Sequence, residues 1–168
     1  MRKVILSIFF LLPLSLAQAN QMCDKKRQLS ISLDDFTIND DNTITDHQTG
    51  LMWKRCLEGQ KGKNCQNDKA QSYTWSKAFE YAKKHKFATY SDWRIPKRKE
   101  LASIIEHQCY LPAINSTLFP NEQGSFVWSS SQLDNDMYKI WTVYFKYGVD
   151  IAKDKDYIFH VRLVRDLD

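Results

Sequence analysis

The spacing of hydrophobic and polar residues changes several times along the chain, and each change predicts a different kind of element. Short apolar stretches at 36–38, 44–46 and 51–53 are separated by clusters of Asn, Asp, Thr and Gly, which are typical turn residues. This pattern predicts three short antiparallel strands joined by tight turns. The preceding segment, 20–35, is polar and then alternates apolar with polar residues. We expect it to be a lead-in that ends in an edge strand.

Two central segments instead carry apolar residues at helical spacing. The stripe of the first helix consists of Trp75, Ala78, Phe79 and Ala82. Thr74 stands where a cap is expected, and the basic run 83–86 suits the carbonyl end of the helix dipole. The second helix should start after Pro96. Its buried stripe consists of Leu101, Ile104 and Ile105. Glu100 lies three residues after Lys97, where its carboxylate can accept a hydrogen bond from the Lys97 amide.

The rest of the chain has the pattern of β-strands. Apolar and polar residues alternate over 126–131 and 139–145, and a last strand is predicted at 157–164. We therefore predict one α+β domain over 36–168, with two helices flanked by short antiparallel strands. Aromatic side chains should fill its core, and the tryptophans expected there are Trp53, Trp75, Trp93, Trp128 and Trp141.

The first nineteen residues have the three-part layout of a secretory signal. Two positive residues precede an apolar run at 4–16, and Ala17-Gln18-Ala19 forms a small-x-small cleavage site. A membrane anchor is the first alternative, but the run is shorter than the ~20 residues of a spanning helix. Lipid attachment at Cys23 is the second alternative, although the small residues that usually precede such a cysteine are missing. We expect an exported protein, periplasmic or at the cell surface, with no transmembrane segment after cleavage.

The net charge changes which partners are expected. It is +4 for the whole chain and falls to +2 once the two positive residues of the signal are removed. A charge this small argues against nucleic acid as a partner, because nucleic-acid binding needs a concentrated basic face. Any basic patch must be local.

The four cysteines predict two disulfides, because an even count in a small exported domain usually forms a disulfide framework. Three pairings are open. Cys56 and Cys65 bracket a short polar loop, so a local Cys56–Cys65 bridge is the economical choice and leaves Cys23 with Cys109. The competing interpretation is a zinc site, but the spacing lacks the close cysteine pairs that such sites use.

No catalytic constellation stands out. Ser129, Ser130 and Ser131 follow Trp128 without the motif that surrounds a nucleophilic serine, and they suit hydrogen bonds to neighbouring backbone. The four histidines lack metal-ligand spacing, and the aspartates at 34–46 lack the spacing of a calcium loop. We therefore expect a protein that is not an enzyme and uses neither a metal nor a cofactor.

Several aromatic-rich motifs occur in a fixed order. They are TD (45–46), TGLMW (49–53), SDWRIP (91–96), KEL (99–101), PAIN (112–115), FPN (119–121) and WSS (128–130), followed by Trp141, Phe145, Gly148 and the pairs VR (161–162) and VR (164–165). In this order they resemble the C-terminal domain family of the Legionella collagen-like protein, a family of exported bacterial domains. The resemblance covers about 36–165, nearly the whole mature chain.

The resemblance implies a C-type lectin-like fold, and the best-known member of the family is an adhesin whose C-terminal domain binds sulfated polysaccharides. Chemistry of the formylglycine-generating enzymes, which share the lectin-like fold, is excluded because no cysteine follows Cys109. Members commonly place Thr after the Pro of the SDWRIP motif, where this chain has Lys97. The substitution removes a helix cap and leaves a dense basic turn.

The leading functional hypothesis is a binding module for an anionic or sulfated glycan. Its candidate ligand-binding residues are Lys97, Arg98 and Lys99, with Tyr90, Tyr144 and Tyr147 as stacking surfaces. A protein-interaction domain of the envelope, either an assembly subunit or an inhibitor, is the second hypothesis, and a purely structural domain is the third. Structural ion pairs are expected for Arg94 and Arg165. Arg162 alternates with apolar residues, so we expect it to face solvent or to pair with Asp92 or Glu100 at partial burial.

Overall fold

We describe the fold from a computed structural model of the chain, for residues 21–167. The expected signal peptide at 1–19 lies outside the described residues. Within them the protein is mostly β, with eleven strands in three sheets and two short α-helices. Its alternating patterns and turn residues therefore dominate the architecture.

The first large sheet has four strands, ordered β11-β4-β3-β2 and all antiparallel. Its members are β2 (Phe36–Ile38), β3 (Thr43–Asp46), β4 (Leu51–Lys54) and β11 (Val164–Asp166). The turn between β3 and β4 forms as its residues predict. The buried Asp46 carboxylate accepts hydrogen bonds from the backbone N–H groups of Gln48 and Thr49, and Gly50 adopts a positive φ of 68°.

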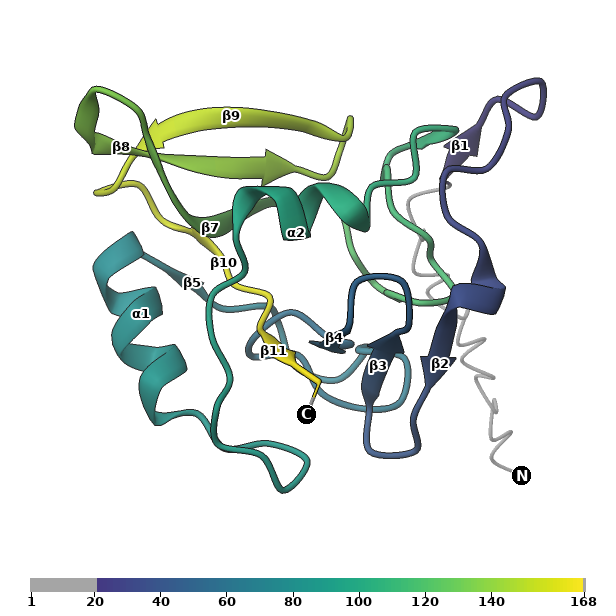
Figure 1. Cartoon of the computed structure of the whole chain (residues 1–168), viewed down its shortest axis with the longest axis horizontal. Coiled ribbons are helices and arrows are strands. Elements are labelled where there is room, and N and C mark those ends of the chain that lie inside the picture. Colours follow the sequence, from purple (N-terminus) through teal and green to yellow (C-terminus); the bar gives the residue numbers. More distant parts are fainter. Residues whose placement is uncertain (1–20, 168) are drawn as a thin grey trace, which may run out of the picture.

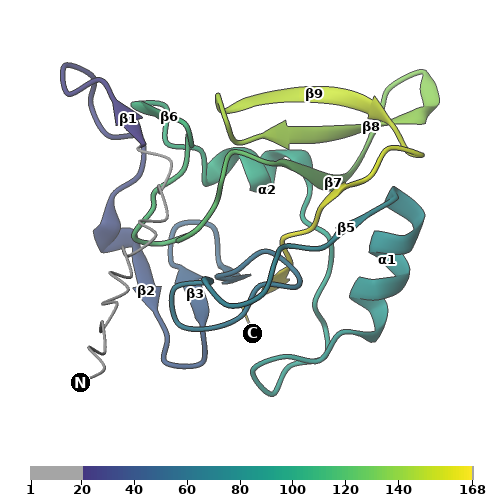
Figure 2. The ribbon, with the colours of Figure 1, turned by 180° about the vertical axis from the view of Figure 1, so that it is seen from behind.

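The second large sheet has five strands, ordered β5-β10-β7-β8-β9. Its members are β5 (Ser72–Tyr73), β7 (Phe126–Leu133), β8 (Asp136–Tyr144), β9 (Val149–Asp154) and β10 (Phe159–His160). All neighbours are antiparallel except β10 and β7, which run parallel. Figure 1 shows the β8–β9 ribbon along the top of the molecule, with the four-stranded sheet below it. The same ribbon lies along the top in the reverse view of Figure 2.

Two helices accompany these sheets. Helix α1 spans Trp75–Lys84 and carries the expected apolar stripe, whereas α2 spans only Arg98–Ser103 and packs against β7 and β8. The Glu100 carboxylate accepts the expected hydrogen bond from the Lys97 backbone N–H, at 2.7 Å. A small sheet pairs β1 (Met22–Cys23) with β6 (Cys109–Tyr110). The Cys23–Cys109 disulfide joins these strands, and the second expected disulfide, Cys56–Cys65, is also present.

The hydrophobic core has two parts. One gathers around Trp53 and Phe119, and the other around Trp93 and Trp128. These four aromatic side chains are buried, whereas Trp75 and Trp141 are only half-buried. Trp75 packs against the second core, at the start of α1.

The expectation of an α+β fold of the C-type lectin-like kind is wrong. The two helices contain ten and six residues, too few to form a helical layer beside the three sheets. The second helix is shorter than its stripe because Ile105 leaves the helix and forms a β-bridge with Ile114. Backbone pairing with a distant segment therefore overrides the local helical spacing.

Three further expectations fail. The segment 157–164 is not one strand but contributes to two sheets, through β10 and the start of β11. Arg162, between them, is completely buried and pairs with Glu122 rather than with Asp92, Glu100 or solvent. The lead-in forms no edge strand at its end, where a short 3-10 turn at Leu33–Asp35 precedes β2.

Candidate functional site

The basic turn before α2 does not present three free cations. Lys97 and Lys99 are exposed, but the Arg98 guanidinium contacts the Asp150 carboxylate and lies 3.7 Å above the ring centroid of Trp141. Arg98 is therefore held against the sheet by an ion pair and a cation–π contact. Arg98 thus contributes to the packing of α2 against the β8–β9 ribbon.

Carboxylates also neutralise the surroundings of this turn. Arg94 donates to both oxygens of Glu100 at 2.8 and 2.9 Å and to Asp166 at 2.8 Å. Burial alone would raise the pKa of Glu100, but hydrogen bonds from Arg94 and the Lys97 amide hold that pKa below its usual value. Arg165 likewise pairs with Asp92. Of the cations at the turn itself, Arg98 is thus paired, and Lys97 and Lys99 are the two that stay exposed.

The three candidate tyrosines do not form one surface. Tyr90 lies between α1 and α2, where the Arg165 guanidinium covers its ring at 4.0 Å from the centroid. Tyr144 belongs to β8, and Tyr147 to the turn that follows it. The structure therefore brings Tyr144 and Tyr147 together and leaves Tyr90 elsewhere.

Tyr144 and Tyr147 belong to a continuous row of rings, which we call the aromatic strip. Its members, in spatial order, are Tyr147, Tyr144, Phe126, Phe159 and Tyr157. Consecutive ring centroids are 5.6, 4.0, 5.0 and 5.7 Å apart, and all but the closely stacked Tyr144–Phe126 pair lie within the usual range of aromatic pairs. The two terminal tyrosines are each 54% exposed, and the three inner rings are partly exposed.

Strand register builds this strip. Phe126 lies directly opposite Tyr144 in the β7–β8 ladder, and their rings stack face to face at an interplanar angle of 2°. The bridge between His160 and Val127 sets β10 beside β7, which brings Phe159 next to Phe126. Aromatic residues far apart in the sequence thus share one face of the five-stranded sheet.

Two lysines border the strip. The Lys153 ammonium lies 5.2 Å from the ring centroid of Phe126, and the Lys146 ammonium lies 5.3 Å from that of Tyr147. Among residues 21–167, no carboxylate oxygen is within 4.0 Å of either ammonium. Alternation along β9 keeps Lys153 on the opposite face from Asp150 and Asp154. The strip therefore combines solvent-accessible rings with positive charge that no ion pair neutralises.

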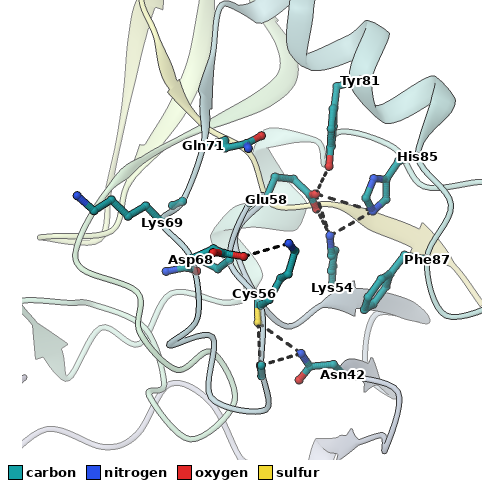
Figure 3. Close-up of a pocket in the computed structure, with 15 residues that line it drawn as sticks. Asn42, Lys54, Cys56, Glu58, Asp68, Lys69, Gln71, Tyr81, His85 and Phe87 are labelled. Atoms are coloured by element: carbon teal, nitrogen blue, oxygen red, sulfur yellow. Dashed lines mark hydrogen bonds and ion pairs between the residues drawn. The ribbon is translucent and has the colours of Figure 1, made fainter.

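A separate cleft of about 730 Å³ lies between the loop after β4, the segment before β5 and the end of α1 (Figure 3). Its wall contains the fully buried carboxylate of Glu58. The Lys54 ammonium lies 2.8 Å from both Glu58 oxygens, and the Tyr81 hydroxyl donates to one of them at 2.7 Å. Both hydrogen bonds go to Glu58 Oε2, so among residues 21–167 the buried Oε1 has the Lys54 ion-pair contact but no hydrogen-bond partner.

His85 completes this buried cluster. Its Nε2 lies 3.1 Å from the Lys54 ammonium, which can only donate, so Nε2 accepts and the ring is neutral. Burial lowers the pKa of His85, and burial together with the Glu58 hydrogen bond raises the pKa of Tyr81. The cluster attaches the end of α1 to β4. Within the described part of the chain, no three His, Cys, Asp or Glu side chains gather as a metal site requires.

Sequence reasoning missed most of the strip. Phe126, Tyr157, Phe159, Lys146 and Lys153 were not among the candidate residues. The sequence carried one indication that Lys153 stays unpaired: in any strand through 149–154, Lys153 and Asp154 fall on opposite faces. The alignment of the rings depends on register, which local spacing does not reveal.

A family model described as the Lcl C-terminal domain matches residues 42–165. Among curated proteins, none matches this chain in sequence. The two disulfides fit an oxidising compartment outside the cytoplasm. Over residues 21–167, none of the helices has the length and apolar character needed to cross a bilayer. The family model covers most of the chain, as the ordered motifs predicted, and the chain belongs to the Lcl C-terminal domain family.

Proposed function

We propose that this domain is a non-catalytic binding module that takes an anionic glycan on the aromatic strip. One observation carries the proposal: Lys146 and Lys153 stand over accessible rings of the strip with no carboxylate to neutralise them. Unpaired lysines beside partly exposed aromatic rings suit a ligand that is both ring-shaped and negatively charged.

The physical basis is twofold. The C–H groups of a sugar ring pack against the face of an aromatic ring, which is apolar and carries partial negative charge. Sulfate or carboxylate groups of the same glycan then meet the lysine ammonium groups. The terminal rings Tyr147 and Tyr157 are more than half exposed, so a chain of several sugar units can extend along the strip. This site replaces the basic turn as the preferred position, because Arg98 is engaged with Asp150.

Heparin serves as the probe, and two variants carry the test. Lys146→Ala/Lys153→Ala removes the charges over the strip, whereas Lys97→Ala/Lys99→Ala removes the same number of exposed charges at the basic turn. We expect heparin affinity to fall about tenfold or more in the first variant and to change little in the second. Affinity for the wild type should also fall steeply with added salt, because exposed charge contacts are screened. Equal losses in both variants would show that only net charge matters and would refute the proposed site.

A further inference from the structure

A second surface lies at the edge of the five-stranded sheet. Strand β9 is the last strand in the order β5-β10-β7-β8-β9, so among residues 21–167 it has a strand neighbour on one side only. Both views of the fold show it along the outer border of the molecule (Figures 1 and 2). A strand in this position presents unpaired backbone N–H and C=O groups to an incoming segment.

The ladder identifies which groups point outward. The Lys155 backbone N–H donates to the Tyr138 carbonyl at 3.0 Å, just beyond the end of β9. Hydrogen-bonded positions alternate along an antiparallel ladder, so the N–H groups of Ile151 and Lys153 also point toward β8. Those of Asp150 and Ala152 then point away from the sheet. No proline or bulge interrupts β9, and its pairing with β8 is regular along all six residues.

Exposed apolar side chains lie at the far end of this ribbon. Met137 is 61% exposed, Tyr138 65% and Ile158 63%, and we call these three the end cluster. The Lys155–Tyr138 hydrogen bond places Met137 and Tyr138 beside the C-terminal end of β9, and Ile158 directly follows the turn that the Tyr157 N–H and the Asp154 carbonyl close there. Large apolar side chains gathered at one end of a sheet and open to solvent are typical of interaction surfaces.

The charge around the end cluster is negative. Four aspartates occur in the two loops at this end: Asp134, Asp136, Asp154 and Asp156. None of them forms an ion pair with a Lys, Arg or His side chain among residues 21–167. Only two lysines, Lys139 and Lys155, stand among them. A partner that supplies positive charge is therefore favoured over an anionic one at this end.

We propose that β9 and the end cluster form a docking edge for an extended segment of a partner protein in which apolar and basic residues alternate. Backbone hydrogen bonds to the outward groups of Asp150 and Ala152 hold the segment as an added strand. Its apolar side chains cover the end cluster, and its basic side chains meet the four aspartates. The docking edge adjoins the Tyr157 end of the aromatic strip, because Tyr157 lies between Asp156 and Ile158 in the sequence, but the docking role does not depend on glycan binding.

The test uses a short synthetic peptide that alternates Ile with Lys, and a second peptide with Glu in place of Lys. The wild-type domain should bind the Lys peptide and not the Glu peptide. Bound Lys peptide should slow hydrogen exchange at the amides of Asp150 and Ala152 and leave the amide of Ile151, already bonded within the sheet, unchanged. Ala152→Pro removes an outward donor at an edge position that tolerates proline, and we expect about tenfold weaker binding. Ala152→Ser keeps the donor and is the matched control.

Tyr138→Ser/Ile158→Ser tests the end cluster through exposed residues whose replacement leaves the fold intact, and it should weaken the Lys peptide by a similar factor. Heparin binding by every variant gives an independent reading of the aromatic strip, so failure of one proposal is distinguishable from failure of the other. The docking edge is refuted if the Lys peptide fails to bind the wild type, if the Glu peptide binds equally well, or if both the Ala152→Pro and the end-cluster variants bind as the wild type does.

Discussion

The buried ion pair between Arg162 and Glu122 is the most demanding electrostatic feature of the fold. Both side chains are at most 1% exposed, and the Arg162 Nη2 atom lies 3.1 Å from the Glu122 Oε2 atom. Arg162 also donates to the backbone carbonyls of Lys54 and Arg55. In the wild type the Ser125 N–H donates to Glu122 Oε1 at 2.9 Å. Glu122→Gln removes the negative charge while keeping the size of the side chain and an oxygen acceptor for this N–H.

The substitution leaves the guanidinium buried without its counter-charge. Removing one partner of a buried pair costs about 3–5 kcal/mol. The two carbonyls still solvate Arg162, so we expect the lower end of that range, about 3 kcal/mol. For a domain of this size, each kcal/mol lowers the melting temperature by about 2–4 °C, which predicts a fall of about 6–12 °C.

Urea denaturation followed by tryptophan fluorescence, with the disulfides kept intact, measures this loss. The exposed pair Lys61–Asp68 supplies the control, because its side chains are 75% and 59% exposed. Asp68→Asn should cost less than about 1 kcal/mol. If Glu122→Gln unfolds at the same urea concentration as Asp68→Asn, burial of this pair does not carry the energy that we assign to it.

Three further predictions follow from single residues. Burial lowers the pKa of His85, so the stability that its neutral form contributes is complete above about pH 6.5 and is lost as the pH falls through the folded-state pKa. Urea midpoints across this range should therefore fall more steeply for the wild type than for His85→Gln. Parallel profiles for the two proteins would contradict the assignment. Gly148 has a φ of 67°, and an added Cβ would lie 2.8 Å from the Ile105 Cγ2 atom. Gly148→Ala should therefore cost about 1–3 kcal/mol in the same assay, and an unchanged midpoint would disprove the strain. Arg98→Leu should lower the melting temperature measurably, because the contacts of Arg98 with Trp141 and Asp150 are lost. Lys99→Leu should leave the melting temperature unchanged. Equal melting temperatures for the two variants would mean that Arg98 is as free as Lys99.

The parts of the fold that the sequence predicted are those governed by neighbouring residues. The strands at 36–54 follow from turn residues such as Gly50, and α1 follows from its apolar stripe. The overall class was missed because long-range pairing decides it. Ile105 matched a helical stripe but bridges Ile114, and the segment around Arg162 matched a single strand but divides between two sheets. Alternation placed the Arg162 side chain on the face opposite the apolar residues. Glu122, forty residues away in the sequence, meets the guanidinium on that opposite face, which is therefore buried too.

The candidate site shows the same limit. A run of three basic residues at 97–99 predicted a positive surface, but Asp150, 52 residues away, engages the middle one. Tyr144 and Tyr147 were predicted as stacking surfaces, while Phe126 and Phe159 join them only through the register of β7, β8 and β10. Which charges stay unpaired and which rings align are properties of the assembled sheet.

The most direct test of the glycan proposal is a titration of the domain with a heparin-derived octasaccharide, followed by nuclear magnetic resonance of its aromatic side chains and lysine ammonium groups. We predict the largest changes at the rings of Phe126, Tyr144 and Tyr147 and at the ammonium groups of Lys146 and Lys153. The changes should saturate together and weaken as salt is added. Changes centred on Lys97 and Lys99, with the rings of the strip unaffected, would contradict the account.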